Sequence, residues 1–385
     1  MPRDNKRFLM VCSQVPPVYG GAGTQAVLLA ESLASHGWRG RVVSLDQSGV
    51  GSHQIDGLAV TRVAKGVVPD RRILRLATTI ALGVCAAFFV LRDRPAVVHI
   101  HGAYWWSIPP SVAGRLIGAV VVVKSTRDGE DDALTVRSKK LGFLPVGWLY
   151  GLSVNCADAF LVLNATSKQV AVDAGYGAKT LIVTNGVDAR KFASDPTRRK
   201  AARAQHGASM DKVIFVFVGY AVVHKGVLDL LLAWDEAALP NAELWLVGPT
   251  TGFYRELGDE IPHLISVGRA VRTFGHVPHD DLPAIMAAAD VFVLPSHAEG
   301  MPNSLLEAAT AGCTIVATSI PGIVDVAGDA DAYLVAPGSV LELEEALRTA
   351  AASPRSPAAI ANRVDMRTVA RQYADLYDRL RIDRG

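Results

Sequence analysis

The stretch of sequence that decides the fold is residues 291–307, VFVLPSHAEGMPNSLLE. It begins with four apolar residues, which is the pattern of a buried strand, and it ends in an apolar helix start. A strand, a polar turn and a helix in this order are typical of a parallel sheet covered by helices. Open sheets of this type bind ligands just outside the carboxyl ends of their strands, which is where the polar turn falls.

Two glutamates bracket this turn. Glu299 lies at the mouth of the loop, and Glu307 lies about two turns into the expected helix. The N-terminus of a helix favours anions, because its free N–H groups and its dipole point toward them. The turn can therefore hold a polyanionic molecule rich in hydroxyl groups, and a nucleotide sugar fits that description.

The composition favours a large protein of two domains. The chain has 385 residues, 50% of them hydrophobic, and a net charge of +2, which gives no indication of a nucleic-acid partner. The sequence has no CxxC pair or Cys/His cluster, so it predicts neither a metal site nor a disulfide, and it favours a reducing cytoplasm. Its cysteines are Cys12, Cys85, Cys156 and Cys313.

Strand and helix patterns alternate along the chain and begin again after a polar stretch. Strands are predicted first at residues 7–12, 40–45, 96–101, 119–124 and 159–163. Residues 185–210 read as a linker with helical pieces, and further strands are predicted at 212–218, 243–247, 271–274, 291–294 and 314–317. The predicted fold class is therefore α/β, with two doubly wound, Rossmann-like domains facing a central cleft.

Residues 76–91 are almost wholly apolar and are flanked by Arg71, Arg72, Arg75, Arg92 and Arg94. A membrane-spanning helix needs about 20 apolar residues, and this run is shorter. Three interpretations stay open: a buried helix between two strands, a helix lying on an anionic membrane surface, or a true span. The N-terminus reads as a lead into the first strand rather than as a signal peptide. We expect a cytoplasmic protein, which the second interpretation places at the inner face of the cell membrane through residues 71–94.

The first glycine cluster, Gly20-Gly21-Ala22-Gly23, stands directly before a predicted helix. Residues 21–26 match the dinucleotide-binding pattern G-x-G-x-x-A, and Asp46 follows at about the expected spacing. However, residues 13–19 separate these glycines from the strand. A mobile loop that contacts donor phosphate or acceptor, and a tight turn without further function, are the other interpretations.

Polar clusters follow the next two strands. Alternation places His99 and His101 on one face of a strand end, and Gly102 and three aromatic residues come directly after them. Residues 124–132 are dense in charge, and this loop is either a solvated turn or part of an acceptor site.

In the second half, Gly219, Tyr220 and Lys225 belong to a turn between the strongest predicted strand and a helix. A glycine turn with one lysine is a reasonable phosphate cradle. The sequence Asp329-Ala330-Asp331 resembles a metal-binding DxD, but no further ligands support it. We read it as a turn and predict no metal.

Together these motifs resemble the retaining glycosyltransferases of the GT-B fold, family four (glycosyl transferases group 1). The resemblance covers nearly the whole chain and is strongest over residues 185–322. Its marks are Gly20-Gly21, His101-Gly102, Asn185-Gly186-Val187-Asp188 with Phe192, Lys225-Gly226, Gly275-His276-Val277 and the Glu-x7-Glu pair Glu299/Glu307.

The resemblance implies a role for each position. The catalytic residues would be His101, at the donor sugar or the reacting carbon, Lys225, which neutralises the leaving diphosphate, and Glu299, beside the donor sugar. Glu307 would hydrogen-bond the ribose, N–H groups around Asn303 and Ser304 would bind phosphate, and residues 275–277 would line the base pocket. The rest of the predicted donor site is Gly20, Gly21, Gly219, Tyr220, Gly275, His276, Val277, Gly300 and Met301. The predicted acceptor site is Tyr104, Trp105, Thr126, Arg127 and Asp128.

The resemblance also implies three parts of the chain. These are an acceptor domain at 1–184, a nucleotide-sugar donor domain at 185–358, and a final helix at 359–385 that packs back on the first domain. The implied activity is retaining transfer of a sugar from a nucleotide-diphosphate sugar to a lipid-linked or polysaccharide-precursor glycan, with no cofactor or metal.

One position departs from the family pattern. Tyr220 stands where the family usually has arginine, and tyrosine carries no positive charge. Either another basic residue supplies the charge, or the diphosphate is stabilised less. Two alternative functions stay open: an NAD-dependent oxidoreductase that uses Gly21 and Gly23, and a catalytically weak sugar-nucleotide-binding subunit.

Overall fold

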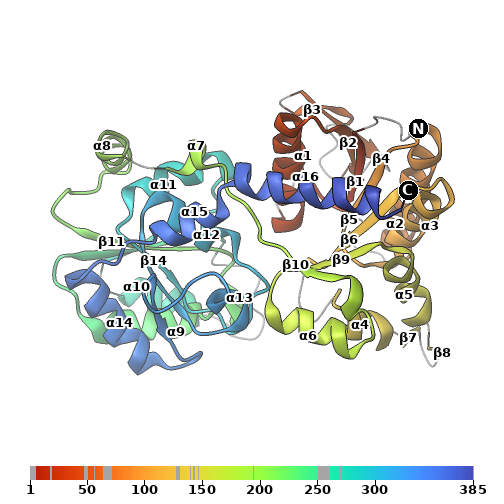
Figure 1. Ribbon diagram of the computed structural model, residues 1–385. Helices are drawn as coiled ribbons and strands as arrows, with labels where there is room; N and C mark the ends of the chain where they lie inside the picture. The colour runs from red at the N-terminus through yellow and green to blue at the C-terminus, as the bar shows by residue number, and fades with distance from the viewer. Residues whose placement is uncertain are drawn as a thin grey trace. The chain divides into compact units, whose positions relative to one another are not determined.

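The computed structural model describes residues 6–17, 20–46, 51–55, 57–63, 72–126, 131–138, 140–141, 144–145, 147–193, 195–249, 260–268 and 270–384. The chain forms two compact α/β units (Figure 1). The N-terminal unit comprises residues 1–186 and 366–385, and the C-terminal unit comprises residues 187–365. The predicted fold class of two doubly wound α/β domains is confirmed.

The N-terminal unit is built on a sheet whose described strands have the order β10-β9-β6-β5-β1-β2-β4-β3. Neighbouring strands are parallel except for β3 and β4, which are antiparallel. The strands are β1 (Arg7–Cys12), β2 (Arg39–Leu45), β3 (His53–Ile55), β4 (Leu58–Val63), β5 (Val97–His101), β6 (Val120–Lys124), β9 (Ala159–Val162) and β10 (Thr180–Ile182). A separate short hairpin joins β7 (Lys140–Leu141) to β8 (Leu144–Pro145).

Helices cover both faces of this sheet. They are α1 (Gly21–Leu33), η1 (Ala34–His36), α2 (Arg72–Asp93), η2 (Trp105–Ser107), α3 (Ile108–Leu116), α4 (Ala133–Ser138), α5 (Gly147–Cys156), α6 (Ala165–Asp173), η3 (Gly177–Lys179) and α16 (Met366–Ile382). Along β1, Phe8 and Met10 pack into one core with α1 and α16, whereas Leu9 and Val11 pack into the other with α2 and α3. Both faces of β1 are apolar because both are buried.

The C-terminal unit has a second parallel sheet, in the order β13-β12-β11-β14-β15-β16. Its strands are β11 (Val213–Val218), β12 (Ala242–Val247), β13 (Val271–Gly275), β14 (Val291–Leu294), β15 (Thr314–Thr318) and β16 (Ala332–Val335). Its helices are α7 (Ala189–Phe192), α8 (Pro196–Gln205), η4 (Val223–Lys225), α9 (Val227–Ala237), α10 (Glu260–Val267), η5 (His279–Asp281), α11 (Leu282–Ala288), α12 (Asn303–Ala311), α13 (Pro321–Val324), α14 (Val340–Ala352) and α15 (Ala358–Val364).

Each sheet reverses its winding at one place. In the N-terminal sheet, the chain adds β2 and β4 on one side of β1 and then adds β5 on the other side. In the C-terminal sheet, β12 and β13 lie on one side of β11, and β14 lies on the other. Ligands of open α/β sheets bind at the carboxyl ends of the strands where the winding reverses, so the two pairs β1/β5 and β11/β14 mark the positions where a site is expected.

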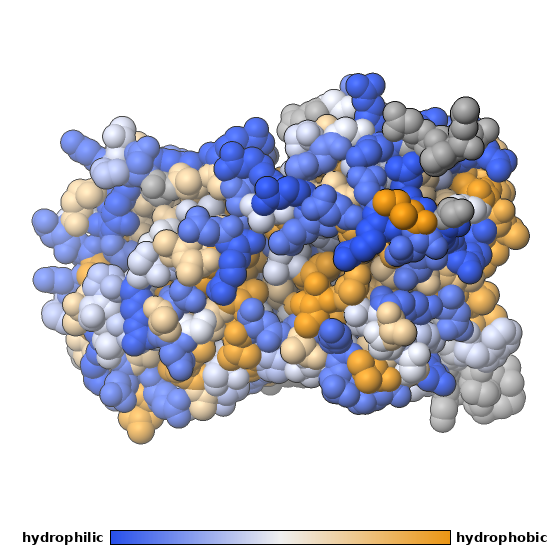
Figure 2. Space-filling view, viewed as in Figure 1, coloured by the Kyte–Doolittle hydropathy of each residue, from blue (hydrophilic) through white to orange (hydrophobic). Residues whose placement is uncertain are grey.

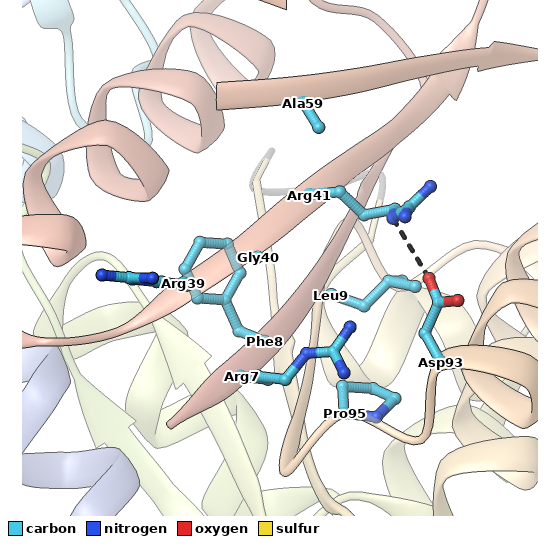
Figure 3. A pocket seen from close by; sticks show the side chains of 9 residues that line it. All are labelled: Arg7, Phe8, Leu9, Arg39, Gly40, Arg41, Ala59, Asp93 and Pro95. Atoms are coloured by element: carbon cyan, nitrogen blue, oxygen red, sulfur yellow. Dashed lines mark ion pairs between the residues drawn. The ribbon is translucent and has the colours of Figure 1, made fainter. Parts of the chain in front are cut away.

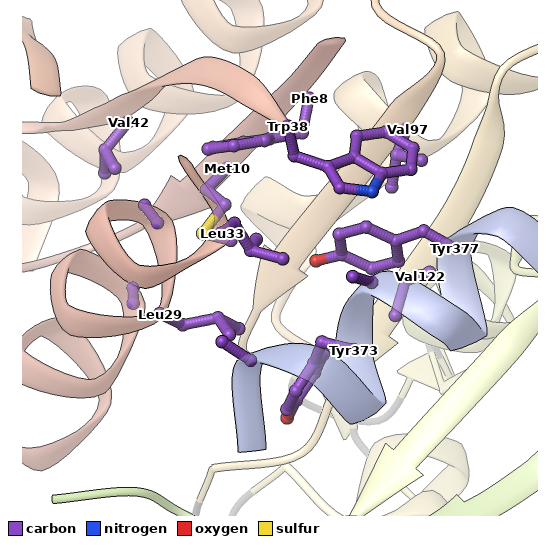
Figure 4. Close-up of a cluster of buried hydrophobic side chains, with 14 of the residues drawn as sticks. Phe8, Met10, Leu29, Leu33, Trp38, Val42, Val97, Val122, Tyr373 and Tyr377 are labelled. Carbon is purple, nitrogen blue, oxygen red and sulfur yellow. The ribbon is translucent and has the colours of Figure 1, made fainter. Parts of the chain in front are cut away.

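Helix α16 completes the N-terminal core although it comes from the end of the chain. Tyr373 and Tyr377 extend from it toward the sheet, and the Tyr377 ring lies against Trp38 with centroids 5.1 Å apart (Figure 4). The Tyr377 hydroxyl is hydrogen-bonded to His99 Nδ1 at 2.6 Å. The Tyr373 hydroxyl is buried and has no hydrogen-bond partner.

The unit boundaries differ from the predicted ones. The N-terminal unit ends at Gly186 rather than 184, and the C-terminal unit runs to Asp365 rather than 358. The reason is that residues 359–385 are not one helix. Helix α15 packs against α12 in the C-terminal unit, and α16 packs against α1 in the N-terminal unit.

Helix α2 has one buried and one exposed apolar face. Leu82, Ala86 and Val90 are buried in the core. On the opposite face, Ile80, Val84, Phe88 and Leu91 are 46%, 58%, 58% and 50% exposed. The interpretation as a buried helix between two strands therefore holds for one face of α2 only. Within the described ranges no helix is long and apolar enough to cross a membrane.

The two tyrosines of α16 allow a matched test of the buried hydrogen bond. Tyr377→Phe leaves His99 Nδ1 buried without its partner, so it should destabilise the N-terminal unit by about 1–3 kcal/mol. Tyr373→Phe removes a buried hydroxyl that lacks a partner, so it should leave stability unchanged or raise it. Urea unfolding followed by near-UV circular dichroism measures both. Equal losses in the two variants would contradict the assignment.

Candidate functional site

The loops that follow β11 and β14 meet at the carboxyl edge of the C-terminal sheet. Lys225 ends η4 in the first loop, and Glu299 lies in the second. Lys225 Nζ is 2.5 Å from Glu299 Oε1, and Ser296 Oγ donates to the same oxygen at 2.7 Å. The side chains of Lys225 and Glu299 are 21% and 10% exposed. The structure thus brings together two predicted site residues that are 74 positions apart in sequence.

Further contacts hold these loops against each other. The His297 N–H donates to the His224 carbonyl at 2.7 Å, and the His297 ring is hydrogen-bonded to Asp229 at 2.6 Å. Gly226 has a φ of +65°, and a Cβ there would lie 2.1 Å from the Pro295 carbonyl oxygen. Glycine is required at this position because the Lys225 loop approaches the end of β14 so closely.

Glu307 lies on α12, in the same unit, and is buried at 7% exposure. Its Oε1 is 2.9 Å from His279 Nε2. His279 follows the predicted base-pocket loop, and its ring makes an edge contact with Phe192, with centroids 5.7 Å apart. Burial opposes protonation of His279, but the hydrogen bond and charge of Glu307 outweigh it and raise the His279 pKa. His279 is not among the predicted site residues, because no local motif marks it.

The other predicted donor residues of this unit lie in the same three loops. Gly219 and Tyr220 follow β11, and Tyr220 is 45% exposed. Gly300 is partly buried and Met301 is buried before α12, and Asn303 and Ser304 form its first turn. Gly275 ends β13, followed by His276, which is exposed, and Val277, which is partly buried.

In the N-terminal unit, His99, His101 and Lys124 form a buried polar cluster. The rings of His99 and His101 lie on one face of β5, 4.4 Å apart, as alternation predicts. His101 is 2% exposed, and both its ring nitrogens lack hydrogen-bond partners. Burial, together with the Lys124 charge, holds the pKa of both histidines well below the usual range. The His101 ring is therefore neutral and enclosed.

Lys124 lies at the end of β6, beside these histidines. Its Nζ donates to Asn185 Oδ1 at 2.9 Å and lies 5.7 Å from the centre of the Tyr373 ring. Burial lowers the pKa of Lys124 to about 7. Lys124 and Asn185 thus tie the end of β6 to the segment that leaves the N-terminal unit.

The loop after β6 is organised by Asp131, which is fully buried. Its carboxylate accepts hydrogen bonds from Ser125 Oγ at 2.9 Å and from Thr126 Oγ1 at 2.9 Å. It also accepts from the N–H of Ala103, at 3.2 Å, in the loop after β5. The Thr126 hydroxyl is thus committed to loop structure, while Arg127 and Asp128 lie outside the described residues.

The remaining predicted residues lie at the carboxyl edge of the same sheet. Gly20 caps α1 and Gly21 begins it. Tyr104 and Trp105 are partly buried, and the Tyr104 ring stacks on Trp106 with centroids 6.0 Å apart. Gly23 is needed for packing, because a Cβ there would lie 1.9 Å from the Gln14 carbonyl oxygen.

Comparison with known proteins identifies the family. Residues 198–367 match the family Glycosyl transferases group 1, and residues 20–186 match the Glycosyl transferase 4-like domain. The two matches cover most of both units. The chain therefore belongs to the group 1 glycosyltransferases, and it is a glycosyltransferase rather than an oxidoreductase.

Similar proteins span most of the chain. Glycogen synthase of Mycobacterium tuberculosis is 28% identical over 96% of this chain and 94% of its own length. The UDP-Gal:alpha-D-GlcNAc-diphosphoundecaprenol alpha-1,3-galactosyltransferase of Escherichia coli is 25% identical over 60% of this chain and 59% of its own. The crystal structure of Anabaena HepE with UDP and glucose has a TM-score of 0.73 at 17% identity, covering 96% of this chain and 99% of that one. This likeness shows a common fold.

The His279–Glu307 pair predicts a pH-dependent contribution to stability. A histidine whose pKa is raised on folding stabilises the fold below its unfolded pKa of about 6.5, and this stabilisation is lost as the pH rises through the folded pKa. Wild type should therefore exceed His279→Gln in thermal stability most at acidic pH, and the difference should shrink toward alkaline pH. The control is His263→Gln, on the exposed surface of α10. A difference that is constant with pH, or that grows with it, would rule out the pairing.

Proposed function

We propose that the protein is a retaining, metal-independent glycosyltransferase that takes its sugar from a nucleotide-diphosphate sugar. The observation that carries this proposal is the meeting of Lys225 and Glu299 where the C-terminal sheet reverses its winding, with Glu307 on the adjoining helix. Such a donor has three parts, and each matches one of these residues. The Lys225 cation suits the diphosphate, the adjacent Glu299 carboxylate suits the sugar, and the buried Glu307 carboxylate suits the ribose. The HepE complex with UDP and glucose, which has the same fold, supports this choice of donor.

Lys225 binds the diphosphate in this proposal. Transfer separates charge between the anomeric carbon and the departing diphosphate, and a cation placed in advance stabilises this charge more in the transition state than in the ground state. The first N–H groups of α12, at Asn303 and Ser304, face the same anion from a helix of nine residues. A leaving group stabilised in this way needs neither a metal nor a cofactor.

Glu307 and the loop before η5 hold the nucleoside. With His279 on Oε1 of Glu307, the other carboxylate oxygen is directed to the ribose hydroxyls. Gly275, His276 and Val277 line the base. Glu299 stays beside the donor sugar as a positioning group, held by Lys225 and Ser296.

The N-terminal unit provides the acceptor side. Tyr104 and Trp105 offer partly exposed aromatic faces, and Gly20 and Gly21 bring backbone near the sugar. His101 supports the end of β5 from within the buried cluster. The acceptor is a lipid-linked or polysaccharide-precursor glycan. The galactosyltransferase relative, whose name specifies a diphosphoundecaprenol acceptor, supports this class, and so does the exposed apolar face of α2 as a peripheral membrane contact at the cytoplasmic side.

A second candidate function is a catalytically weak sugar-nucleotide-binding subunit. Tyr220, which replaces a cation, favours it. His224 does not substitute for that charge, because burial and the adjacent Lys225 lower its pKa. Measured turnover with a sugar nucleotide would exclude this candidate.

Nucleotide binding tests the role of Glu307. Glu307→Ala should weaken UDP binding by about 100-fold, since it removes a charged acceptor of two ribose hydrogen bonds, each worth about 1.5 kcal/mol or more. Isothermal titration calorimetry measures the affinity, preceded by a thermal-shift screen of UDP-, GDP- and ADP-sugars to choose the nucleotide. The control Glu345→Ala removes an exposed carboxylate of α14. Unchanged affinity in Glu307→Ala would remove the ribose assignment.

Product stereochemistry and chelation test the chemistry. Proton NMR during turnover should show a product with the anomeric configuration of the donor. Turnover should stay within about twofold after EDTA treatment, because Lys225 and α12 stabilise the leaving group without a divalent ion. An inverted product would overturn the retaining mechanism, and loss of activity that Mg²⁺ or Mn²⁺ restores would overturn metal independence.

A further inference from the structure

A basic cavity lies at the amino edge of the N-terminal sheet, opposite the edge that carries His101 and Thr126. Its volume is about 200 Å³, and it is lined by the starts of β1 and β2, by Ala59 and by the end of α2. Figure 3 shows Arg41 reaching Asp93 across the cavity, with the Arg7 side chain on the same side, whereas Arg39 points away. Neither the proposed donor residues nor the proposed acceptor residues line this cavity.

The cavity carries an excess of positive charge. The Arg7 and Arg41 side chains lie on the cavity side with a single carboxylate, Asp93, so these side chains carry a net charge of +2 − 1 = +1. The carboxylate is already engaged twice, by Arg41 Nε at 3.1 Å and by Arg92 Nε at 2.7 Å. Arg7 is exposed and forms no ion pair with any described residue, so its charge remains available to an anion.

The exposed face of α2 ends at this cavity. Ile80, Val84, Phe88 and Leu91 follow one another at spacings of four, four and three residues, which places them in one stripe along the helix. Figure 2 shows apolar residues gathered at the edge of the N-terminal unit where α2 and α3 lie. Single exposed apolar residues are common on protein surfaces, whereas several exposed apolar residues in one stripe are typical of an interaction surface.

Arg92 joins the stripe to the cavity. Its guanidinium carbon lies 5.8 Å from the centre of the Phe88 ring and 4.6 Å from that of Phe89, and the same side chain holds Asp93. Arg41 lies 5.3 Å from the Phe89 ring, and Arg94 is exposed one residue beyond the helix. Cationic and apolar side chains therefore lie beside each other at the end of α2.

We propose that this surface, the docking face, binds a bilayer that contains anionic phospholipid, with phosphate headgroups entering the arginine cavity. The docking face consists of Ile80, Val84, Phe88, Leu91, Arg7, Arg41, Arg92 and Arg94. The proposal rests on the membrane-linked acceptor proposed above and adds the lipid class and the residues that recognise it. A free phosphate would use the arginines alone, whereas a bilayer also covers the apolar stripe, because its headgroup region is anionic and its interior apolar.

Vesicle flotation tests the docking face with the full-length protein. Wild type should bind vesicles of phosphatidylcholine with phosphatidylglycerol, bind vesicles of phosphatidylcholine alone at least tenfold more weakly, and lose binding as salt rises. Arg7→Gln/Arg94→Gln should weaken binding about 25-fold, because each basic residue near the surface contributes about fivefold. Leu91→Gln should weaken it about five- to tenfold by removing an inserted apolar side chain.

Matched variants control for charge and hydropathy elsewhere. Arg371→Gln/Lys200→Gln removes the same two charges from exposed positions outside the docking face, and Leu341→Gln removes an apolar side chain that is 73% exposed on α14. Both controls should bind vesicles as wild type does. Equal losses of vesicle binding in the controls and the docking-face variants would overturn the proposal. Binding would then depend on the net charge or hydropathy of the whole protein and not on the docking face.

Two further measurements separate this proposal from the enzymatic one. UDP affinity of the docking-face variants, by calorimetry, should equal that of wild type. Absence of vesicle binding by a wild-type protein that binds UDP would overturn the docking face alone, whereas vesicle binding with no UDP binding would overturn the proposed donor and leave the docking face standing. Calorimetric binding of inorganic phosphate that Arg7→Gln/Arg94→Gln abolishes, without vesicle binding, would assign the cavity to a soluble anion and overturn the proposal.

Discussion

The ion pair between Lys225 and Glu299 is the contact on which the C-terminal unit's site depends. It joins the loops after β11 and β14, the two strands between which the sheet reverses its winding, and these loops also meet through His297 and Gly226. A donor diphosphate would share the Lys225 charge with Glu299. Because Tyr220 adds no charge, the N-terminus of α12 in the proposed donor site would stabilise more of the diphosphate's charge than it would beside a second cation. In the proposed site, the charge that Tyr220 lacks and the position of the α12 N-terminus would therefore both affect how far the leaving group is stabilised.

The N-terminal unit buries polar side chains of its parallel sheet, among them His99, His101 and Lys124. His99 Nδ1 and Lys124 Nζ are hydrogen-bonded to residues distant in sequence, Tyr377 and Asn185, whereas His99 Nε2 is buried without a partner. Both partners lie at or beyond the segments where the chain passes between the units. The core of the N-terminal unit is therefore incomplete until the last helix has been synthesised, and the strand ends next to the proposed acceptor residues are held by that helix.

What the sequence could predict was local. The order of strand, loop and helix, the spacing of Glu299 and Glu307, and the common face of His99 and His101 all follow from periodicity, which a single segment contains. The contact of His279 with Glu307 joins residues 28 apart, and the hydrogen bond of His99 with Tyr377 joins residues 278 apart. Neither of these long-range contacts can be recognised from a local sequence pattern. Helix α2 is a different case, because its almost continuous apolar run does not indicate which face is buried. The packing of α2 against α3, η2 and the sheet distinguishes its two faces.

The parallel sheet of the N-terminal unit also separates the two kinds of surface proposed for it. Strands β1, β5 and β6 run in one direction, so the loops with Gly20, Tyr104 and Thr126 all emerge at the carboxyl edge. The amino edge of this sheet lies opposite these loops, and there Arg7 of β1 and Arg41 of β2 line one cavity with the end of α2. A bilayer held at the amino edge would leave the carboxyl edge uncovered. The direction of the strands, which is set by the alternation of strands and helices in the sequence, thus allows one sheet to hold a membrane contact and a substrate-binding edge without competition between them.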